Sequence, residues 1–235
     1  MDLPDSTAVV TGAGVGSGLA IAERLLAVGA RVALTDLAET PGTTELLRTA
    51  DGRAVFVPAD LTRDADIARV VDVAVDTFGG LSVLVNNAGG GGHLPPHFPD
   101  ASVDEWTRTL DLNLRTPLLA IQLALPHLRA AGGVVVNIGS TAGAGIRPYA
   151  SPEYGAAKAG LIRATTCLGG LDGVRVTCVV PDWLGTERAL AELAALPAAE
   201  RAAVVPPIPL ARLCDEVVVL IEDDTSAGRV VVLSR

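Results

Sequence analysis

The feature that most constrains the fold is a regular alternation between short, Val-rich apolar runs and longer segments with helical spacing. Strands are expected at residues 8–11, 32–35, 54–57, 82–85, 134–138, 174–180 and 229–233. Helices are expected between them, at residues 16–28, 44–50, 64–78, 102–129, 152–168 and 215–222. Most of the runs are apolar on both faces, as in central strands of a parallel sheet that helices cover. The alternation therefore predicts a single doubly wound α/β domain over residues 1–235, with about seven parallel strands and right-handed crossovers.

The composition agrees with such a core and excludes several other classes of protein. Hydrophobic residues make up 49% of the 235 residues and aromatic residues only 3%, so the core must consist of Val, Leu, Ile and Ala. This hydrophobic content rules out a disordered chain. The net charge is −9 and no basic block is present, so no nucleic-acid partner is expected. No apolar run is long enough for a membrane span, so no membrane contact is expected either.

The cysteines and the N-terminus indicate a cytoplasmic protein. Cys167, Cys178 and Cys214 lack the spacing of metal ligands and cannot all pair with one another, so reduced thiols are the simplest interpretation. The first five residues are acidic and contain no long apolar stretch, so no signal peptide is expected.

A glycine-rich loop follows the first expected strand and opens the first helix. It reads Thr11-Gly12-Ala13-Gly14-Val15-Gly16-Ser17-Gly18. Glycines permit a tight turn and a close approach of the backbone to a pyrophosphate, which the free N–H groups of the helix N-terminus bind. The position between a strand and a helix favours a dinucleotide-binding loop. A glycine turn at a crowded strand–helix junction is the structural alternative.

Asp36, which follows the second expected strand, indicates the kind of dinucleotide. A carboxylate at this place accepts hydrogen bonds from a ribose 2′-hydroxyl and repels a 2′-phosphate. Neither Val15 nor Leu37 is an Arg or Lys that would receive that phosphate. The sequence therefore predicts NAD rather than NADP as the cofactor, with a solvated strand-end aspartate as the alternative.

Tyr154 and Lys158 lie four residues apart on an expected helix, so their side chains share one face. A cation beside a phenol favours the phenolate, so the pKa of Tyr154 is expected to fall toward neutrality. The other tyrosine, Tyr149, has Glu153 instead of a lysine four residues further on. Pairs of this kind are common by chance, so the pair acquires meaning only together with other motifs.

These motifs occur in the order typical of the short-chain dehydrogenase/reductase family, and the chain resembles that family over nearly its whole length. The resemblance rests on the glycine-rich loop, Asp60-Leu61, Asn86-Asn87-Ala88-Gly89, Asn113, Ser140, Tyr154-x-x-x-Lys158 and Pro181-Asp182-Trp183-Leu184-Gly185-Thr186. It implies a Rossmann fold and an NAD-dependent oxidoreductase that transfers a hydride between NAD(H) and a secondary alcohol or ketone. It also implies a small hydroxy or keto compound as substrate and a homo-oligomer, either a dimer or a tetramer.

The resemblance also implies roles for individual residues. Tyr154 is the expected general acid in carbonyl reduction and general base in alcohol oxidation, and Lys158 depresses its pKa and holds the nicotinamide ribose. Ser140 is expected to hydrogen-bond the substrate oxygen, or else to cap a turn. Asn113 is expected to support a water relay to Lys158, or else to satisfy a helix end. The implied cofactor-binding residues are Gly12, Gly14, Val15, Gly16, Ser17, Gly18, Asp36, Leu37, Asp60, Leu61, Asn87, Ala88, Gly89, Tyr154, Lys158, Pro181, Leu184 and Thr186, and no metal site is expected.

Two positions near these motifs have consequences of their own. Asp182 replaces the glycine usual after Pro181, which removes the freedom for positive φ and places an acid near the carboxamide-binding loop. Pro117 lies four residues after Asn113 on an expected helix. Its missing N–H would leave the Asn113 carbonyl free for a bound water, or would merely kink the helix.

Three segments are expected to form the substrate pocket, at residues 90–99, 141–152 and 187–209. The segment at residues 187–209 interrupts the alternation of strands and helices and is expected to be a substrate lid. The alternative is a surface insertion without a function. Arg147 and Arg188 are candidates for binding a substrate carboxylate, or else surface charges. His93 and His97 flank Pro95-Pro96, which disrupts any helical metal pair, so exposed or substrate-loop histidines are expected.

Two other functions are compatible with the fold. A non-oxidative relative would use the Ser140–Tyr154 pair for lyase-type chemistry, and a dinucleotide-binding protein would sense the cofactor without turnover. The intact glycine-rich loop and the complete set of catalytic candidates favour the oxidoreductase.

Overall fold

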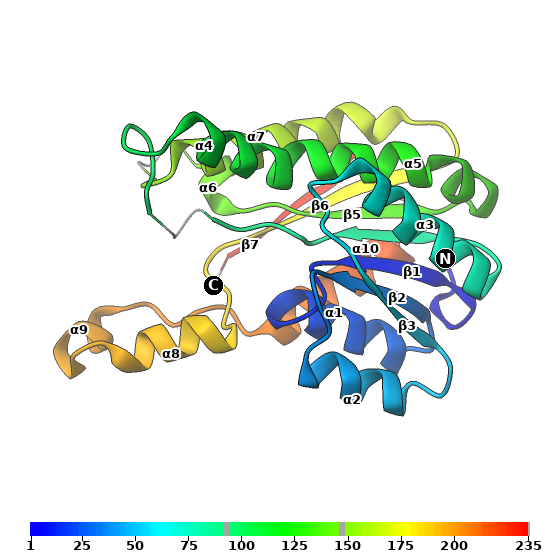
Figure 1. The fold of residues 1–235 in the computed structure, drawn as a ribbon, viewed down its shortest axis with the longest axis horizontal. Coiled ribbons are helices and arrows are strands. Elements are labelled where there is room, and N and C mark those ends of the chain that lie inside the picture. The colour runs from blue at the N-terminus through cyan, green and yellow to red at the C-terminus, as the bar shows by residue number, and fades with distance from the viewer. Residues whose placement is uncertain (92–94, 146–148, 235) are drawn as a thin grey trace.

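Seven parallel strands form one sheet in the computed structural model, which describes residues 1–91, 95–145 and 149–234 (Figure 1). The strands are β1 (Thr7–Thr11), β2 (Arg31–Asp36), β3 (Ala54–Pro58), β4 (Val83–Asn86), β5 (Val134–Ile138), β6 (Arg175–Pro181) and β7 (Val230–Leu233). Their order in the sheet is β3-β2-β1-β4-β5-β6-β7. The predicted single-domain α/β fold is confirmed, and each strand end lies within one residue of its expected place.

Helices cover both faces of the sheet, as the apolar strands require (Figure 1). One face carries α1 (Gly16–Ala27), α2 (Pro41–Thr49) and α10 (Leu210–Glu222), and the other carries α3 (Asp64–Phe78), α4 (Val103–Leu110), α5 (Thr116–Ala131) and α7 (Pro152–Cys167). Successive side chains of β1 point to opposite faces. Val10 packs in the core with Leu25 and Leu213, whereas Val9 packs in the second core with Ile67 and Ile121.

The prediction of one helix over residues 102–129 is wrong in one respect. A π-helical segment, Asp111–Arg115, separates α4 from α5, and the N–H of Thr116 donates to the carbonyl of Asp111. Such a turn is wider by one residue than an α-helical turn and occurs often at functional sites. Asn113 lies in the middle of this segment and is fully buried. The wide turn aims the Asn113 side chain at the loop after β4, although the free carbonyl expected from Pro117 stays a prediction.

Shorter helices complete the chain. A helix that the sequence reading missed, α6 (Thr141–Ala144), follows β5, and short 3-10 turns lie at Leu3–Asp5 and Leu168–Gly170. The segment at residues 187–209 folds as α8 (Glu187–Ala195) and α9 (Ala198–Ala203), which extend from the body as an arm (Figure 1). Two backbone hydrogen bonds join the two ends of the arm where it leaves the body. Ile208 N donates to Trp183 O at 2.7 Å, and Gly185 N donates to Ile208 O at 2.8 Å.

From β1 the chain continues to β2 and β3 on one side of the sheet, and from β4 it continues to β5, β6 and β7 on the other side. At such a switch point the connections leave in opposite directions, and a crevice opens at the carboxyl ends of β1 and β4. Thr11, at the end of β1, joins the two sides of this crevice. Its Oγ1 accepts hydrogen bonds from Asn87 N at 3.0 Å and Ala88 N at 2.9 Å, and donates to Val85 O at 3.2 Å. One hydroxyl therefore holds the loop after β4 against the loop after β1.

Replacing Thr11 by Val should lower the free energy of unfolding by about 2 kcal/mol, because Ala88 N loses its acceptor and Asn87 N keeps only Val85 O, at 3.1 Å. Thr35 on the neighbouring strand provides a matched control, since its buried hydroxyl makes no hydrogen bond. Thr35→Val should leave the stability unchanged or raise it. Urea unfolding followed by circular dichroism measures both effects, and equal losses in the two variants would contradict the role given to Thr11.

Candidate functional site

The glycine-rich loop has glycines where the backbone leaves no room for a side chain. Gly12 and Gly16 have φ values of +63° and +60°, which favour glycine. A Cβ atom on Gly12 would lie 2.8 Å from Ala88 Cα, and one on Gly18 would overlap the carbonyl of Gly12. The loop therefore presents bare backbone at the start of α1, whose first turn contains no acidic residue.

Asn87 fastens this loop to the end of β4. Its Nδ2 donates to Thr11 O at 2.9 Å and to Gly12 O at 3.1 Å, and its Oδ1 accepts from Ser17 Oγ at 2.8 Å. Both hydrogens of the Asn87 amide are therefore used to fix the shape of the loop.

The carboxylate of Asp36 lies directly beside the loop. Asp36 Oδ2 accepts from Gly14 N, and Oδ1 accepts from Leu37 N, both at 2.8 Å. The two N–H groups hold the carboxylate in place, and each oxygen retains capacity for a further donor. Asp60 lies nearby, and hydrogen bonds from Thr62 hold the pKa of its carboxyl below the usual value.

Two adjoining clefts bring most of the predicted site residues together. A cleft of about 840 Å³ is lined by Gly12, Val15, Gly16, Ser17, Asp36, Leu37, Asp60, Leu61, Asn87, Ala88, Gly89 and Thr186. The adjoining cleft, of about 1360 Å³, is lined by Ser17, Asn87, Gly89, Ser140, Tyr154, Lys158, Pro181, Leu184 and Thr186. Gly14, Gly18 and Asn113 line neither cleft but support residues that do.

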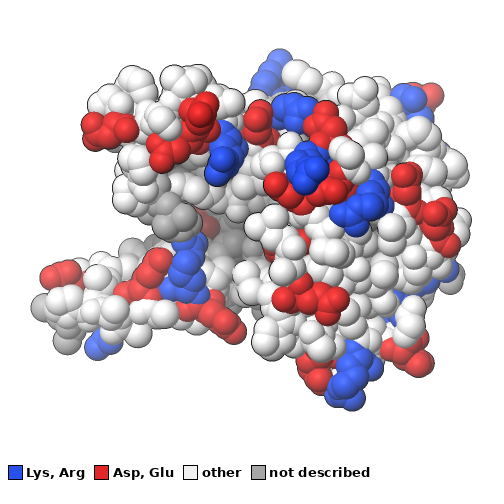
Figure 2. Space-filling model, in the orientation of Figure 1, with Lys and Arg blue, Asp and Glu red and all other residues white. Residues whose placement is uncertain are grey.

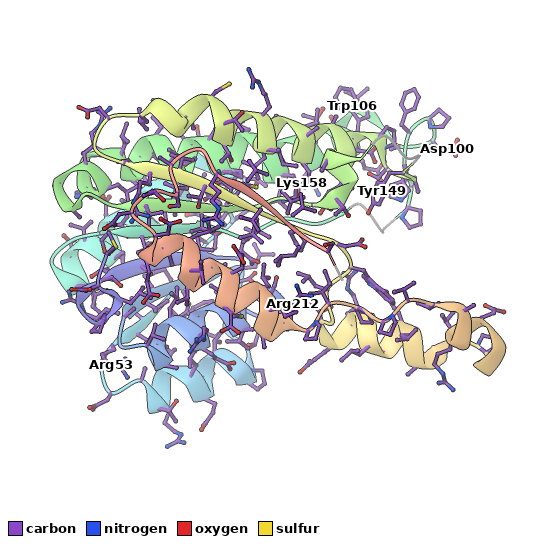
Figure 3. The ribbon with its side chains drawn as sticks, turned by 180° about the vertical axis from the view of Figure 1, so that it is seen from behind. Arg53, Asp100, Trp106, Tyr149, Lys158 and Arg212 are labelled. Carbon is purple, nitrogen blue, oxygen red and sulfur yellow. The ribbon has the colours of Figure 1, made fainter. Side chains whose placement is uncertain are left out.

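The catalytic candidates Tyr154 and Lys158 lie in the N-terminal half of α7, and Ser140 lies beside Tyr154. Figure 3 shows Lys158 and Tyr149 at the side of the body that faces the arm. The ammonium of Lys158 lies 5.8 Å from the centroid of the Tyr154 ring and donates to Ile138 O at 2.9 Å. Ser140 serves two purposes, since its Oγ accepts from Ala142 N at 3.2 Å as the cap of α6 and also hydrogen-bonds the phenol of Tyr154.

Asn113 joins this group through the loop after β4. Its Oδ1 accepts from Gly90 N at 3.0 Å, and its Nδ2 donates to the carbonyls of Gly90 and Thr109, each at 2.9 Å. A Cβ atom on Gly89 would lie 2.6 Å from Asn113 Oδ1 and 3.1 Å from Lys158 Nζ. Asn113 thus fixes the backbone around Lys158, and the predicted water relay stays a prediction.

Burial dominates the acid–base properties of Tyr154 and Lys158. Desolvation raises the pKa of Tyr154, the hydrogen bond from Ser140 lowers it, and Tyr149 raises it further. The expectation that Lys158 lowers the pKa of Tyr154 is therefore not met by the groups of the chain itself. Burial also lowers the pKa of Lys158 to about 8, because a charged ammonium is poorly solvated there.

Asp182 adopts its place without strain. Asp51 is the one non-glycine residue with positive φ in the described part of the chain, so Asp182 does not need the freedom of the glycine it replaces. Its carboxylate accepts from Thr141 Oγ1 at 3.2 Å and lines the larger cleft. The acid therefore connects the segment after β5 with the segment after β6.

The expected substrate segments lie around the larger cleft, which Tyr149, Trp183 and Arg188 also line. Figure 2 shows a hollow between the arm and the body. Arg147 and His93 lie outside the described residues. No group of metal-ligating side chains occurs among the residues that the structure describes, nor does a helix long and apolar enough to cross a membrane.

One buried cluster was missed by the sequence analysis. The carboxylate of Glu153 accepts from Ser151 Oγ at 2.8 Å and lies 3.3 Å from His97 Nδ1. Ser151 also caps α7 by accepting from Tyr154 N. His97 is therefore partly buried rather than exposed, and its spacing from Glu153 gave no signal in the sequence.

Comparison with known proteins agrees with this arrangement. Residues 6–194 match the family described as short chain dehydrogenase. Cis-4-hydroxycyclohexanecarboxylate dehydrogenase from Sinomonas cyclohexanicum is 37% identical over 89% of this chain and 84% of its own length. Glucose 1-dehydrogenase 2 from Bacillus subtilis is 34% identical over 79% of this chain and 74% of its own length.

Solved structures show the same likeness. A short chain dehydrogenase from Burkholderia cenocepacia in complex with NADP has a TM-score of 0.85 and 28% identity, covering 100% of this chain and 98% of that one. A second structure, a short-chain dehydrogenase/reductase from Burkholderia xenovorans, has a TM-score of 0.85 and 31% identity, over 99% and 96% of the two chains. The chain is a member of the short-chain dehydrogenase/reductase family of oxidoreductases.

Proposed function

We propose that the protein is an NAD-dependent oxidoreductase that interconverts a secondary alcohol and a ketone. The observation that carries this proposal is the junction of the two clefts. One cleft contains Asp36 and the other contains Ser140, Tyr154 and Lys158, and both are lined by Ser17. The bare backbone of the glycine-rich loop at this junction suits a pyrophosphate. A dinucleotide extended from Asp36 would reach the catalytic candidates.

The chemistry follows from these side chains. When bound, the dinucleotide supplies or accepts the hydride. Ser140 donates a hydrogen bond to the substrate oxygen, Tyr154 transfers a proton to or from that oxygen, and Lys158 binds the nicotinamide ribose. Because burial raises the pKa of Tyr154, its phenol stays protonated at neutral pH, which is the state that carbonyl reduction requires. Alcohol oxidation requires the phenolate and should therefore gain from rising pH.

The choice of NAD rests on the carboxylate beside the loop. Asp36 is held by two backbone N–H groups, and a 2′-phosphate in that place would meet its negative charge. Leu37 and Val15 are largely exposed apolar residues, so neither supplies a compensating cation. The Burkholderia cenocepacia structure contains NADP, so the preference of this chain needs its own test.

The substrate that we propose is a mid-sized hydroxy or keto compound. Relatives act, by their names, on a hydroxylated ring carboxylate and on glucose, both of which carry secondary hydroxyl groups. The arm at residues 187–209 is the proposed lid of this pocket. A cytoplasmic location agrees with three free cysteine thiols, and a homo-oligomer is proposed from the family alone.

An activity screen tests the proposal directly. The protein is incubated with NAD and a panel of cyclic alcohols and sugars, and the absorbance of reduced nicotinamide is followed. Turnover on any of them supports the proposal. Tight binding of NAD without turnover on a broad panel would instead favour the alternative of a dinucleotide-binding protein or a non-oxidative relative.

Removing the Tyr154 hydroxyl should abolish turnover and leave NAD binding in place. Tyr154→Phe retains the ring but loses the proton that the reaction moves, so kcat should fall by about 10²-fold or more. Tyr149→Phe is the matched control, because Tyr149 lines the same cleft and its ring centroid lies 5.9 Å from that of Tyr154. Similar kcat values for both variants would contradict the role of Tyr154.

Asp36 should set the cofactor preference. The double variant Asp36→Ala, Leu37→Arg removes the charge that repels a 2′-phosphate and supplies a cation beside it, so the preference for NAD over NADP should narrow. The ratio of kcat/KM for the two cofactors is the measurement. A ratio equal to that of the wild type would show that Asp36 does not face the ribose.

Lys158 should contribute to function at the expense of stability. Its pKa falls from 10.5 to about 8 on folding, so below pH 8 the folded protein contains a poorly solvated ammonium. Lys158→Met removes this group and should raise the free energy of unfolding at pH 7 by up to about 3 kcal/mol, while turnover is lost.

The stabilisation expected from Lys158→Met depends on pH. Between pH 8 and 10.5 the unfolded chain binds more protons at Lys158 than the folded chain, so the wild type gains stability as pH rises. The advantage of Lys158→Met should therefore shrink across this range and vanish above it. Urea unfolding of both proteins at pH 7 and pH 10 measures the difference, and parallel pH profiles would refute a buried, charged Lys158.

A further inference from the structure

Arg188 occupies a place at the site to which the proposed function gives no role. It lies in the first turn of α8 and lines both clefts. The described residues that line both clefts are Ser17, Asn87, Gly89, Thr186 and Arg188. Arg188 is the one charged residue in that set. It therefore lies where the cleft beside Asp36 meets the cleft beside Tyr154.

A dinucleotide that reaches from Asp36 to Lys158 has to cross this junction with its central pyrophosphate, which carries two negative charges. The glycine-rich loop offers backbone N–H groups there but contains no Arg or Lys. Asp36, Asp60 and Glu187 line the same cleft and add negative charge, and Arg108 is the other arginine that lines it beside Arg188. The loop therefore has no cationic side chain of its own to meet a pyrophosphate. Of the two arginines that line this cleft, only Arg188 also lines the cleft beside Tyr154.

The start of α8 is well placed to supply that cation. Thr186, the N-cap of α8, has its Cγ2 atom 3.4 Å from where a Cβ on Gly16 would lie, so the helix begins against the glycine-rich loop. Arg188 follows two residues later. Its only ion pair among the described residues is with Glu192, at 3.9 Å, and the two side chains are 56% and 55% exposed. A pair this long and exposed contributes little stability, so exchanging it costs little.

We propose that Arg188 binds the pyrophosphate of the dinucleotide and gives up Glu192 to do so. The inference rests on the proposed function, since it assumes that a dinucleotide binds between the clefts. A guanidinium forms paired, charge-assisted hydrogen bonds with phosphate oxygens. Because Arg188 belongs to the arm, the contact ties the lid of the substrate cleft to the cofactor.

The test measures binding rather than activity. ADP-ribose contains the pyrophosphate without the nicotinamide, and its Kd is determined by isothermal titration calorimetry at several salt concentrations. Arg188→Met should raise this Kd about tenfold and flatten its dependence on salt, because one charge-assisted contact is lost. Arg188→Lys should recover part of the affinity, since the charge is kept without the paired geometry.

Arg201→Met is the matched control. Arg201 lies on α9 of the same arm, donates to Ala194 O and lines neither cleft, so its loss should leave the Kd of ADP-ribose unchanged. If the wild type binds ADP-ribose and Arg188→Met binds it equally well, with the same salt dependence, the inference is overturned and Arg188 is a surface or substrate-facing charge. If the wild type binds neither NAD nor ADP-ribose, the proposed function itself fails.

Discussion

The rest of the site depends on one constraint, which is the close backbone contact between the loops that follow β1 and β4. A Cβ atom on Gly12 or Gly18 would collide with neighbouring backbone, so two loops from different strands approach each other without side chains between them. Thr11 and Asn87 then supply the hydrogen bonds that such bare backbone needs. Because these contacts are short and mutual, the shape of the crevice is set before any ligand enters.

A second set of buried polar contacts fixes the catalytic helix to the same sheet. Asn86 Nδ2 on β4 donates to Asn137 Oδ1 on β5 at 2.9 Å, and Asn137 Nδ2 donates to Thr165 Oγ1 on α7 at 3.0 Å. All three side chains are buried, and an interior chain of this kind is specific because any shift leaves a polar group unpaired. The network therefore determines how far along the sheet α7 lies, and with it the position of Lys158 relative to the crevice.

The sequence predicts the sheet closely because its strands are buried on both faces and each reads as an apolar run between turn residues. It does not predict the π-helical turn at Asp111–Arg115. Pro117 indicates at most a kink there, and the bonds between Asn113 and Gly90 that accompany the turn join distant parts of the chain. The helix α6 has only four residues, too few for a periodic pattern. The pKa of Tyr154 was misjudged for a similar reason. Spacing shows that Lys158 is near, whereas the burial that raises the pKa of Tyr154 arises only from tertiary packing.

The way the arm is attached has a consequence for its movement. Its two ends meet at Ile208 and the Trp183–Gly185 turn, and the same turn leads directly to Thr186 beside the glycine-rich loop. The arm is thus joined to the body through a short connection, and any movement of the arm also moves residues that pack against Gly16. If the arm is the lid proposed above, an opening that admits substrate would therefore also loosen the contact between Thr186 and the glycine-rich loop.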